Sequence, residues 1–96
     1  LLGEAGTFLF NTMANMVFTF MKYDIGHSTS ILFAGDDMCM NAPSKKNGNF
    51  NHIIEAMSLK AKVEQTTRPT FCGWCLTKYG IYKKPQLVLD RWMIAE

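Results

Sequence analysis

Two adjacent aspartates, Asp36 and Asp37, are the residues whose type and spacing most directly suggest chemistry. They follow Gly35 and lie between two expected strands, residues 30–34 and 38–41, whose apolar runs are ILFA and MCM. Carboxylate oxygens are preferred ligands of Mg²⁺, which usually shares one or two carboxylates with water and phosphates. Two such ions, about 4 Å apart, activate an attacking hydroxyl and stabilise a leaving oxygen. The stretch therefore favours a site for Mg²⁺ or Mn²⁺, although Gly-Asp-Asp alone is also typical of ordinary surface turns.

Two asparagines interrupt the most apolar segment of the chain. Residues 8–23 predict a helix, buried nearly all round because most of its positions are apolar. A loop at residues 3–6 is expected before it, with Thr7 as the N-cap. Asn11 and Asn15 lie on one side of this helix, and a buried amide needs a hydrogen-bond partner. Both a structural tie to nearby backbone and a functional role remain open for them.

The three cysteines, Cys39, Cys72 and Cys75, indicate a reducing compartment, because the count is odd and no signal peptide precedes them. Cys72 and Cys75 form a CxxC pair, but a structural zinc site needs four ligands and no second pair follows. A redox CxxC should open a helix, whereas the surrounding residues predict strand. Cysteines packed on strands as small hydrophobic residues are therefore favoured.

Composition suits one small globular unit, since the 96 residues are 48% hydrophobic and carry a formal net charge of +2. The longest apolar stretch, residues 8–21, is below the roughly 20 residues of a membrane span. The C-terminal third is cationic, which is compatible with phosphate contacts or with a solvated surface. Its basic residues are Lys60, Lys62, Arg68, Lys78, Lys83, Lys84 and Arg91.

The remaining pattern predicts an α+β fold. The Asp36–Asp37 pair is expected at the tip of a buried hairpin that turns at residues 35–37. The other expected elements are an exposed loop at 42–49, an amphipathic helix at 50–58, a half-buried strand at 59–65, a hairpin of strands 70–76 and 80–83, and a helix that opens at Pro85.

Several motifs, taken together, resemble a known family. GEAGTFLFNTMAN at residues 3–15 and FAGDD at residues 33–37 resemble motifs B and C of viral RNA-dependent RNA polymerases. TFCGWCLTKYGIYKKPQLVLDR at residues 70–91 resembles motif E and the start of the thumb. The resemblance covers essentially the whole chain and points to the replicase polyproteins of the betaflexivirus group or related alphavirus-like plant viruses.

This resemblance implies part of a right-hand polymerase: a palm fragment at residues 1–84 and the start of a thumb helix at 85–96. The implied reaction is template-directed nucleotidyl transfer from NTPs to an RNA 3′ end, with two Mg²⁺ or Mn²⁺ ions per complete site. The implied partners are template RNA, the nascent strand, and the methyltransferase and helicase domains of the polyprotein. The implied location is the host-cell cytoplasm, in replication complexes held at membranes by other parts of the polyprotein.

The resemblance also assigns roles to single residues. Asp36 corresponds to the metal ligand of motif C and Asp37 to its less direct neighbour. Lys60 or Lys62 falls where motif D supplies a lysine that protonates the leaving pyrophosphate. Substrate contacts, including recognition of the ribose 2′-hydroxyl by the T-x-x-x-N pattern, fall on Gly3, Thr7, Asn11 and Asn15. RNA contacts near the 3′ end fall on Phe71, Cys72, Gly73, Trp74, Lys83 and Lys84.

The chain departs from the family pattern in two places. Leu2 stands where the family has serine before Gly3, and motif A, which carries another metal-binding aspartate, is absent. The fragment is therefore expected to be inactive by itself. A non-catalytic RNA-binding module with a chance Gly-Asp-Asp turn is the alternative. A reverse transcriptase palm is disfavoured, because those enzymes have a different residue before the aspartate pair.

Overall fold

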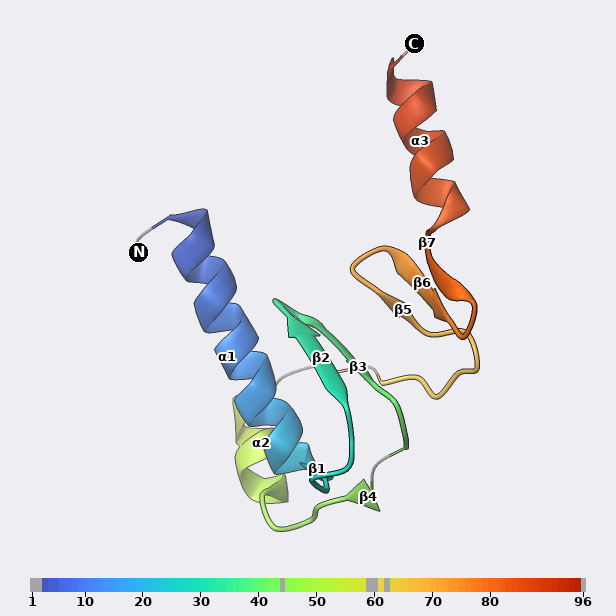
Figure 1. The fold of residues 1–96 in the computed structure, drawn as a ribbon. Coiled ribbons are helices and arrows are strands. Elements are labelled where there is room, and N and C mark those ends of the chain that lie inside the picture. Colours follow the sequence, from blue (N-terminus) through green and yellow to red (C-terminus); the bar gives the residue numbers. More distant parts are fainter. Residues whose placement is uncertain (1–2, 44, 59–60, 62, 96) are drawn as a thin grey trace. The chain divides into compact units, whose positions relative to one another are not determined.

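The computed structural model describes residues 3–43, 45–58, 61 and 63–95, and the chain divides into two compact units, Leu1–Gln65 and Thr66–Glu96. Helices and small antiparallel sheets alternate along both units, so the α+β class is confirmed (Figure 1). The proposed division into a palm at 1–84 and a thumb helix at 85–96 stays a prediction.

The first unit is built on one long helix, α1, at Glu4–Lys22. The expected loop at residues 3–6 is wrong, because the helix begins one residue after Gly3, which is its N-cap. Glu4 in the first turn and Lys22 in the last suit the helix dipole. Thr7 is thus an internal helix residue rather than a cap, and its N–H donates to the Gly3 carbonyl at 3.1 Å.

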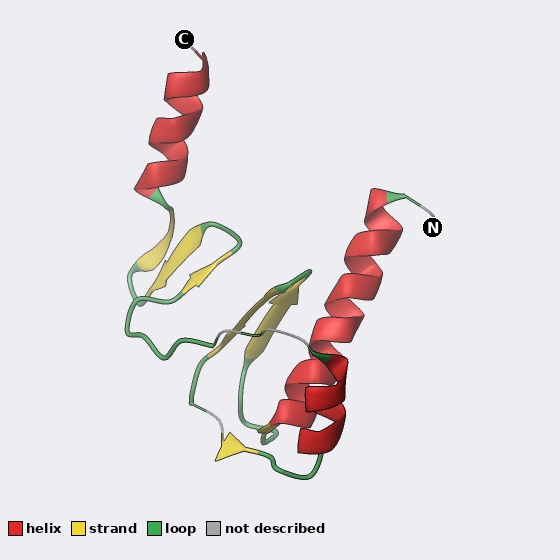
Figure 2. Cartoon of the chain, turned by 180° about the vertical axis from the view of Figure 1, so that it is seen from behind, coloured by secondary structure: helices red, strands yellow, loops and turns green. Residues whose placement is uncertain are grey.

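Short elements surround the C-terminal half of α1. Strand β1, Tyr23–Asp24, pairs antiparallel with β4, Lys45–Lys46, inside the segment that was expected to be a loop. Helix α2, Asn51–Met57, matches the predicted amphipathic helix and lies against α1 (Figures 1 and 2). It ends at Ser58, whose left-handed φ of 52° stops the helix.

The hairpin that carries the aspartates lies beside α1 in the first unit (Figure 1). Strand β2, Ile31–Ala34, pairs with β3, Asp37–Met40, in a register that sets Ala34 opposite Asp37. The loop therefore holds two residues, Gly35 and Asp36, and Asp37 already belongs to the strand. Of these two, only Gly35 has a positive φ (55°), the pattern of a type II′ loop with glycine first.

Burial is much lower than the sequence predicts. Among the residues whose exposure is described, the buried ones are Gly6, Phe18, Thr19 and Tyr23. The prediction that α1 is buried nearly all round is wrong for this chain, since Phe10 is 63% exposed and Val17 58%. The hairpin is likewise half-buried rather than buried, with Leu32 49% exposed. The described elements are too small to cover every apolar face of this helix.

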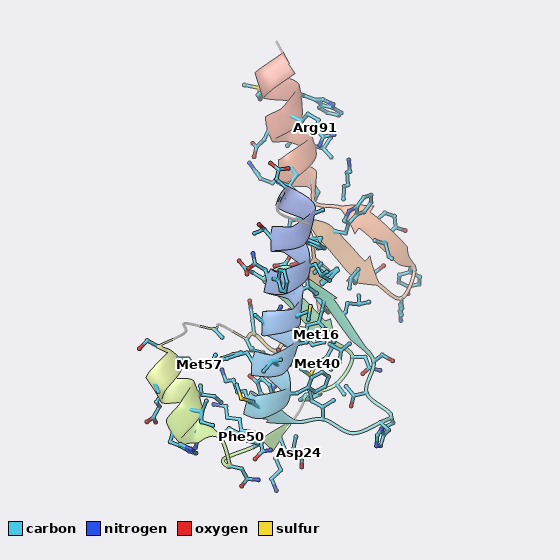
Figure 3. All side chains as sticks on the ribbon, turned by 90° about the vertical axis from the view of Figure 1, so that its left-hand side faces the viewer. Met16, Asp24, Met40, Phe50, Met57 and Arg91 are labelled. Atoms are coloured by element: carbon cyan, nitrogen blue, oxygen red, sulfur yellow. The ribbon has the colours of Figure 1, made fainter. Side chains whose placement is uncertain are left out.

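An apolar groove runs along the exposed side of α1. Its volume is about 500 Å³, and Phe50, the N-cap of α2, is among the residues that line it. Figure 3 labels Met16 on α1 and Phe50 beside α2. The other lining residues are Met13, Val17, Phe20 and Met21.

The second unit is a three-stranded antiparallel sheet followed by a helix. The strands are β5 at Thr70–Phe71, β6 at Trp74–Thr77 and β7 at Gly80–Lys83, and helix α3 covers Pro85–Ala95 as predicted. The single strand expected at residues 70–76 is wrong, because Cys72 and Gly73 turn the chain back so that Phe71 pairs with Trp74. Both turn residues have positive φ, 52° and 84°, as a type I′ loop requires.

The segment between the two units contains no strand where the structure describes it, at residues 61 and 63–65. The half-buried strand predicted there is wrong for those residues, and its remaining positions lie outside the described ones. Alternation of lysine with apolar residues suits a strand, but a strand also needs a partner edge. Among the described helices, none has the length and apolar character needed to cross a membrane.

Candidate active site

The aspartate turn presents two carboxylates from a short, well-defined loop. Asp36 and Asp37 are both exposed, while Gly35 before them is half-buried. A methyl group at Gly35 would lie 3.5 Å from Cε1 of Phe8, which is ordinary contact. The left-handed backbone, rather than lack of space, is therefore what favours glycine here. The turn rests on the Phe8 ring and projects Asp36 outward.

Side chains along one face of α1 hold the backbone of this turn. The Gly35 N–H donates to Thr12 Oγ1 at 2.8 Å, and Asn15 Nδ2 donates to the carbonyls of Gly35 and Asp37 at 3.0 and 3.1 Å. Thr19 Oγ1 donates in turn to Asn15 Oδ1 at 3.3 Å. The residues of α1 that face the turn are therefore Phe8, Thr12, Asn15 and Thr19. They are spaced i, i+4, i+7 and i+11, so they share one side of the helix.

These hydrogen bonds give a structural partner to one of the two asparagines of α1, Asn15. Asn15 finds its partners in the turn backbone, as a structural tie would, and both N–H bonds of its amide are used there. Asn11 is exposed, one turn earlier on α1, and Thr7 is exposed one turn before that. Gly3 caps the helix. The substrate contacts predicted for these four residues stay predictions.

The donor set at the turn fits a hard divalent cation in part. Two carboxylates on adjacent residues can supply oxygen ligands to Mg²⁺ that also keeps waters and phosphate oxygens. Within residues 3–43, 45–58, 61 and 63–95, no group of three His, Cys, Asp or Glu side chains could hold a metal. The turn can therefore provide part of a ligand set, with Asp36 at the loop and Asp37 beside it.

A second candidate surface lies within the second unit. A pocket of about 340 Å³ is lined by four residues predicted to contact RNA, namely Cys72, Gly73, Trp74 and Lys83. The Lys83 Nζ atom lies 5.6 Å from the centroid of the Trp74 ring, a cation–π distance. Four residues of α3 complete the lining: Leu87, Val88, Arg91 and Trp92.

Local geometry explains how α3 reaches this pocket. The Lys84 N–H donates to the Gly73 carbonyl at 3.0 Å, which ties the start of α3 to the β5–β6 turn. A methyl group at Gly73 would lie 2.8 Å from Cδ1 of Leu87, so this side chain would have to shift, and the φ of 84° also favours glycine. Figure 3 labels Arg91 on α3. Two tryptophans and two cations around one hollow are suited to a base and a phosphate.

Not every predicted site residue lies at one of the two candidate sites, and some residues at those sites were not predicted to act there. Lys60 and Lys62, the candidates for the acid that protonates pyrophosphate, lie outside the described residues. Phe71 lies on β5, beside the pocket's turn. Thr12 and Thr19 were not selected as site residues, although their helical spacing from Asn15 was a usable signal. Arg91 and Trp92 were likewise detectable as neighbours of Val88 on α3, at i+3 and i+4.

The cysteines are thiols in this structure. Cys39 and Cys75 lie half-buried on β3 and β6, as expected, whereas Cys72 is exposed in a turn rather than on a strand. Cys72 thus lies in a hairpin loop and Cys75 on the following strand, and the CxxC pair does not open a helix.

Comparison with known proteins gives consistent matches. A family model described as "RNA dependent RNA polymerase" matches residues 2–90. The chain is 56% identical over 93 residues to the RNA replication polyprotein of Apple stem pitting virus, a match that covers 97% of the chain and 4% of that protein. It is 54% identical over 94 residues to the RNA replication protein of Potato virus S, covering 98% and 27%.

A third relative carries a more explicit name. The RNA-directed RNA polymerase of Apple chlorotic leaf spot virus is 48% identical over 93 residues, covering 97% of the chain and 5% of that protein. The chain thus spans from 4% to 27% of the length of these three relatives. No solved structure matches the chain significantly. The resemblance drawn from the motifs, to betaflexivirus replicases, is confirmed.

Proposed function

Because the chain belongs to the RNA-dependent RNA polymerase family, we propose that it supplies the motif B-to-E part of a palm. The complete enzyme then transfers nucleotides from NTPs to an RNA 3′ end, as directed by an RNA template. One observation carries the proposal: an exposed Asp36 on a two-residue loop, anchored to the helix that bears the motif B residues.

In this reaction Asp36 would supply a carboxylate oxygen to a divalent ion, and Asp37 would add negative charge beside it. Mg²⁺ or Mn²⁺ held there would supply Lewis-acid activation of the attacking 3′-hydroxyl and charge neutralisation of the triphosphate. The chain's own task is positioning, because phosphoryl transfer depends mainly on alignment and electrostatic stabilisation. Three hydrogen bonds hold the turn to α1, so the position of the turn is fixed relative to this helix.

The single most direct test is metal removal from the complete polymerase. Excess EDTA should lower RNA-templated nucleotide incorporation to background, a loss of at least about 10³-fold, and added Mg²⁺ should restore it. Incorporation is measured by extension of an annealed RNA primer, with a template-free reaction as the control. Extension that continues in excess chelator would contradict the proposal.

Sugar selection is proposed for Asn11 and Thr7. Both are exposed on successive turns of α1, and later residues of the same helix hold the aspartate turn, which supports a shared nucleotide site. An amide can both donate to and accept from a 2′-hydroxyl. That hydroxyl separates RNA precursors from DNA precursors.

Replacing Asn11 with alanine in the complete polymerase should reduce the preference for NTP over dNTP by about tenfold, the value of one hydrogen bond to the sugar. The ratio of kcat/KM for the two nucleotides is the measurement. Asn49→Ala is the matched control, because Asn49 is exposed in the loop before α2. An unchanged ratio in Asn11→Ala would remove Asn11 from the proposed sugar site.

RNA contact near the 3′ end is proposed for the pocket of the second unit. Trp74 and Trp92 offer aromatic faces for a base, and Lys83 and Arg91 offer charge for a phosphate. Partners of the whole protein follow the same proposal: template RNA, nascent RNA, NTPs, and the methyltransferase and helicase domains of the replicase polyprotein. We place this assembly in the host-cell cytoplasm, at membranes reached through other parts of the polyprotein.

A further inference from the structure

We propose that Thr12, Asn15 and Thr19 form a clamp that sets the direction of the Asp36 carboxylate. All three are positioning residues, because they bind the backbone of the turn or each other. The inference rests on the proposed function, since it assumes that Asp36 binds the metal. It goes further by naming the residues that position this ligand, two of which, Thr12 and Thr19, have no role in the resemblance.

The clamp takes hold of backbone atoms on both sides of Asp36. Before it, the Gly35 N–H and the Gly35 carbonyl are bonded to Thr12 and Asn15. After it, the Asp37 carbonyl is bonded to the same Asn15 nitrogen. The two peptide planes that flank Gly35 therefore cannot rotate without breaking a bond to α1. Because the Asp36 side chain is exposed, its direction depends on this backbone rather than on packing.

Thr19 holds the other end of the Asn15 amide. Its hydroxyl donates to Asn15 Oδ1 from a buried position, with only 2% of the residue exposed. A flipped amide would point Oδ1 at two carbonyl oxygens and lose both hydrogen bonds to the turn, so the Gly35 and Asp37 carbonyls set its orientation. The buried threonine supports this orientation by anchoring the amide oxygen.

Thr12 is oriented in the same manner by its own helix. Its hydroxyl donates to the Phe8 carbonyl at 2.7 Å, four residues earlier, and so presents a lone pair to the Gly35 N–H. A threonine bonded to the preceding turn is a common arrangement in helices. Here the Thr12 hydroxyl links the Phe8 carbonyl of α1 to the Gly35 N–H of the aspartate turn.

The test uses the complete polymerase with isosteric changes. Thr12→Val and Thr19→Val each remove a hydroxyl and keep the side-chain shape, Thr12→Ser restores the hydroxyl, and Thr70→Val on exposed β5 is the matched control. The first readout is hydrogen exchange of the Gly35 amide in metal-free protein, followed in overlapping peptides from residues 31–40. The second is the Mg²⁺ concentration that gives half-maximal primer extension, compared with KM for NTP.

The clamp predicts that Thr12→Val speeds exchange of the Gly35 amide about fivefold and raises the half-maximal Mg²⁺ concentration about fivefold, as the loss of one hydrogen bond implies. Thr19→Val should shift both in the same direction by a smaller factor. KM for NTP should stay within about twofold, and Thr12→Ser should behave as wild type. If Thr12→Val does not fold, the same two measurements on Thr19→Val alone test the clamp.

Other outcomes overturn the clamp. Unchanged Gly35 exchange in Thr12→Val and Thr19→Val would mean that these hydroxyls do not hold the turn. Faster exchange with an unchanged Mg²⁺ requirement would mean that the metal ligand does not need them. If Asn15→Ala alters the NTP-to-dNTP ratio instead of the Mg²⁺ requirement, Asn15 acts on the nucleotide. Asp36→Ala, measured beside them, separates the two proposals: if it retains full extension the proposed function itself fails, and otherwise only the clamp does.

Discussion

Replacing Asp36 with alanine in the complete polymerase should abolish primer extension, with a loss of about 10³-fold or more. The carboxylate contributes to metal-borne charge stabilisation worth several kcal/mol, and each 1.36 kcal/mol changes the rate tenfold. The fold should survive, because Asp36 is exposed at a loop tip and such substitutions usually change stability by less than about 0.5 kcal/mol. Primer extension and thermal unfolding of the same preparation measure the two effects.

Asp24→Ala is the matched control for this experiment. Asp24 is also an exposed aspartate of the first unit, on β1, at the opposite end of α1 from the start of motif B. It should leave extension within about twofold of wild type. Activity in Asp36→Ala close to that of Asp24→Ala would mean that Asp36 is not the metal ligand. A large fall in melting temperature in Asp36→Ala would instead point to a structural role.

The second large effect concerns the 96-residue chain by itself, which should show no nucleotide incorporation. Its described residues supply two adjacent carboxylates but no group of three potential metal ligands. Two-metal catalysis needs both ions held about 4 Å apart, so part of a ligand set gives weak binding without alignment. Primer extension with the purified chain at high Mg²⁺ and at high Mn²⁺ is the measurement.

A second readout separates an incomplete site from an unfolded chain. Circular dichroism should report the helices α1, α2 and α3, and Mn²⁺ titration followed by electron paramagnetic resonance should give weaker binding than in the complete polymerase. Metal-dependent incorporation above the protein-free background would contradict the prediction. So would Mn²⁺ binding as tight as that of the complete enzyme.

Local features of the fold were predictable because local chemistry determines them. The turn at Gly35 follows from a glycine between two apolar runs, and the helix after Pro85 follows from the fixed φ of proline at a first helical position. The start of α1 was not, since the glycines at 3 and 6 favoured a loop on propensity alone. The pairing of β1 with β4 was also invisible, because two-residue strands carry no periodicity.

Burial was the least predictable property. An apolar helix indicates that its side chains pack against other residues. It does not indicate where in the sequence those packing partners lie. Phe10 and Val17 remain exposed here because the described elements leave much of their surface uncovered. The candidate site shows the same limit. That Asn15 needed partners was clear from its apolar surroundings, yet the partners, Gly35 and Asp37, lie 20 and 22 residues further along the chain.

The length of the two-residue loop determines which sequence changes this region can tolerate. With Ala34 opposite Asp37 and Ile31 opposite Met40, the length of the loop fixes which face every β3 side chain occupies. An exchange of one residue for another would alter one contact. One inserted or deleted residue would turn Met38, Cys39 and Met40 over together and carry Asp36 away from its anchor. We therefore expect this segment to accept substitutions far more readily than changes in length.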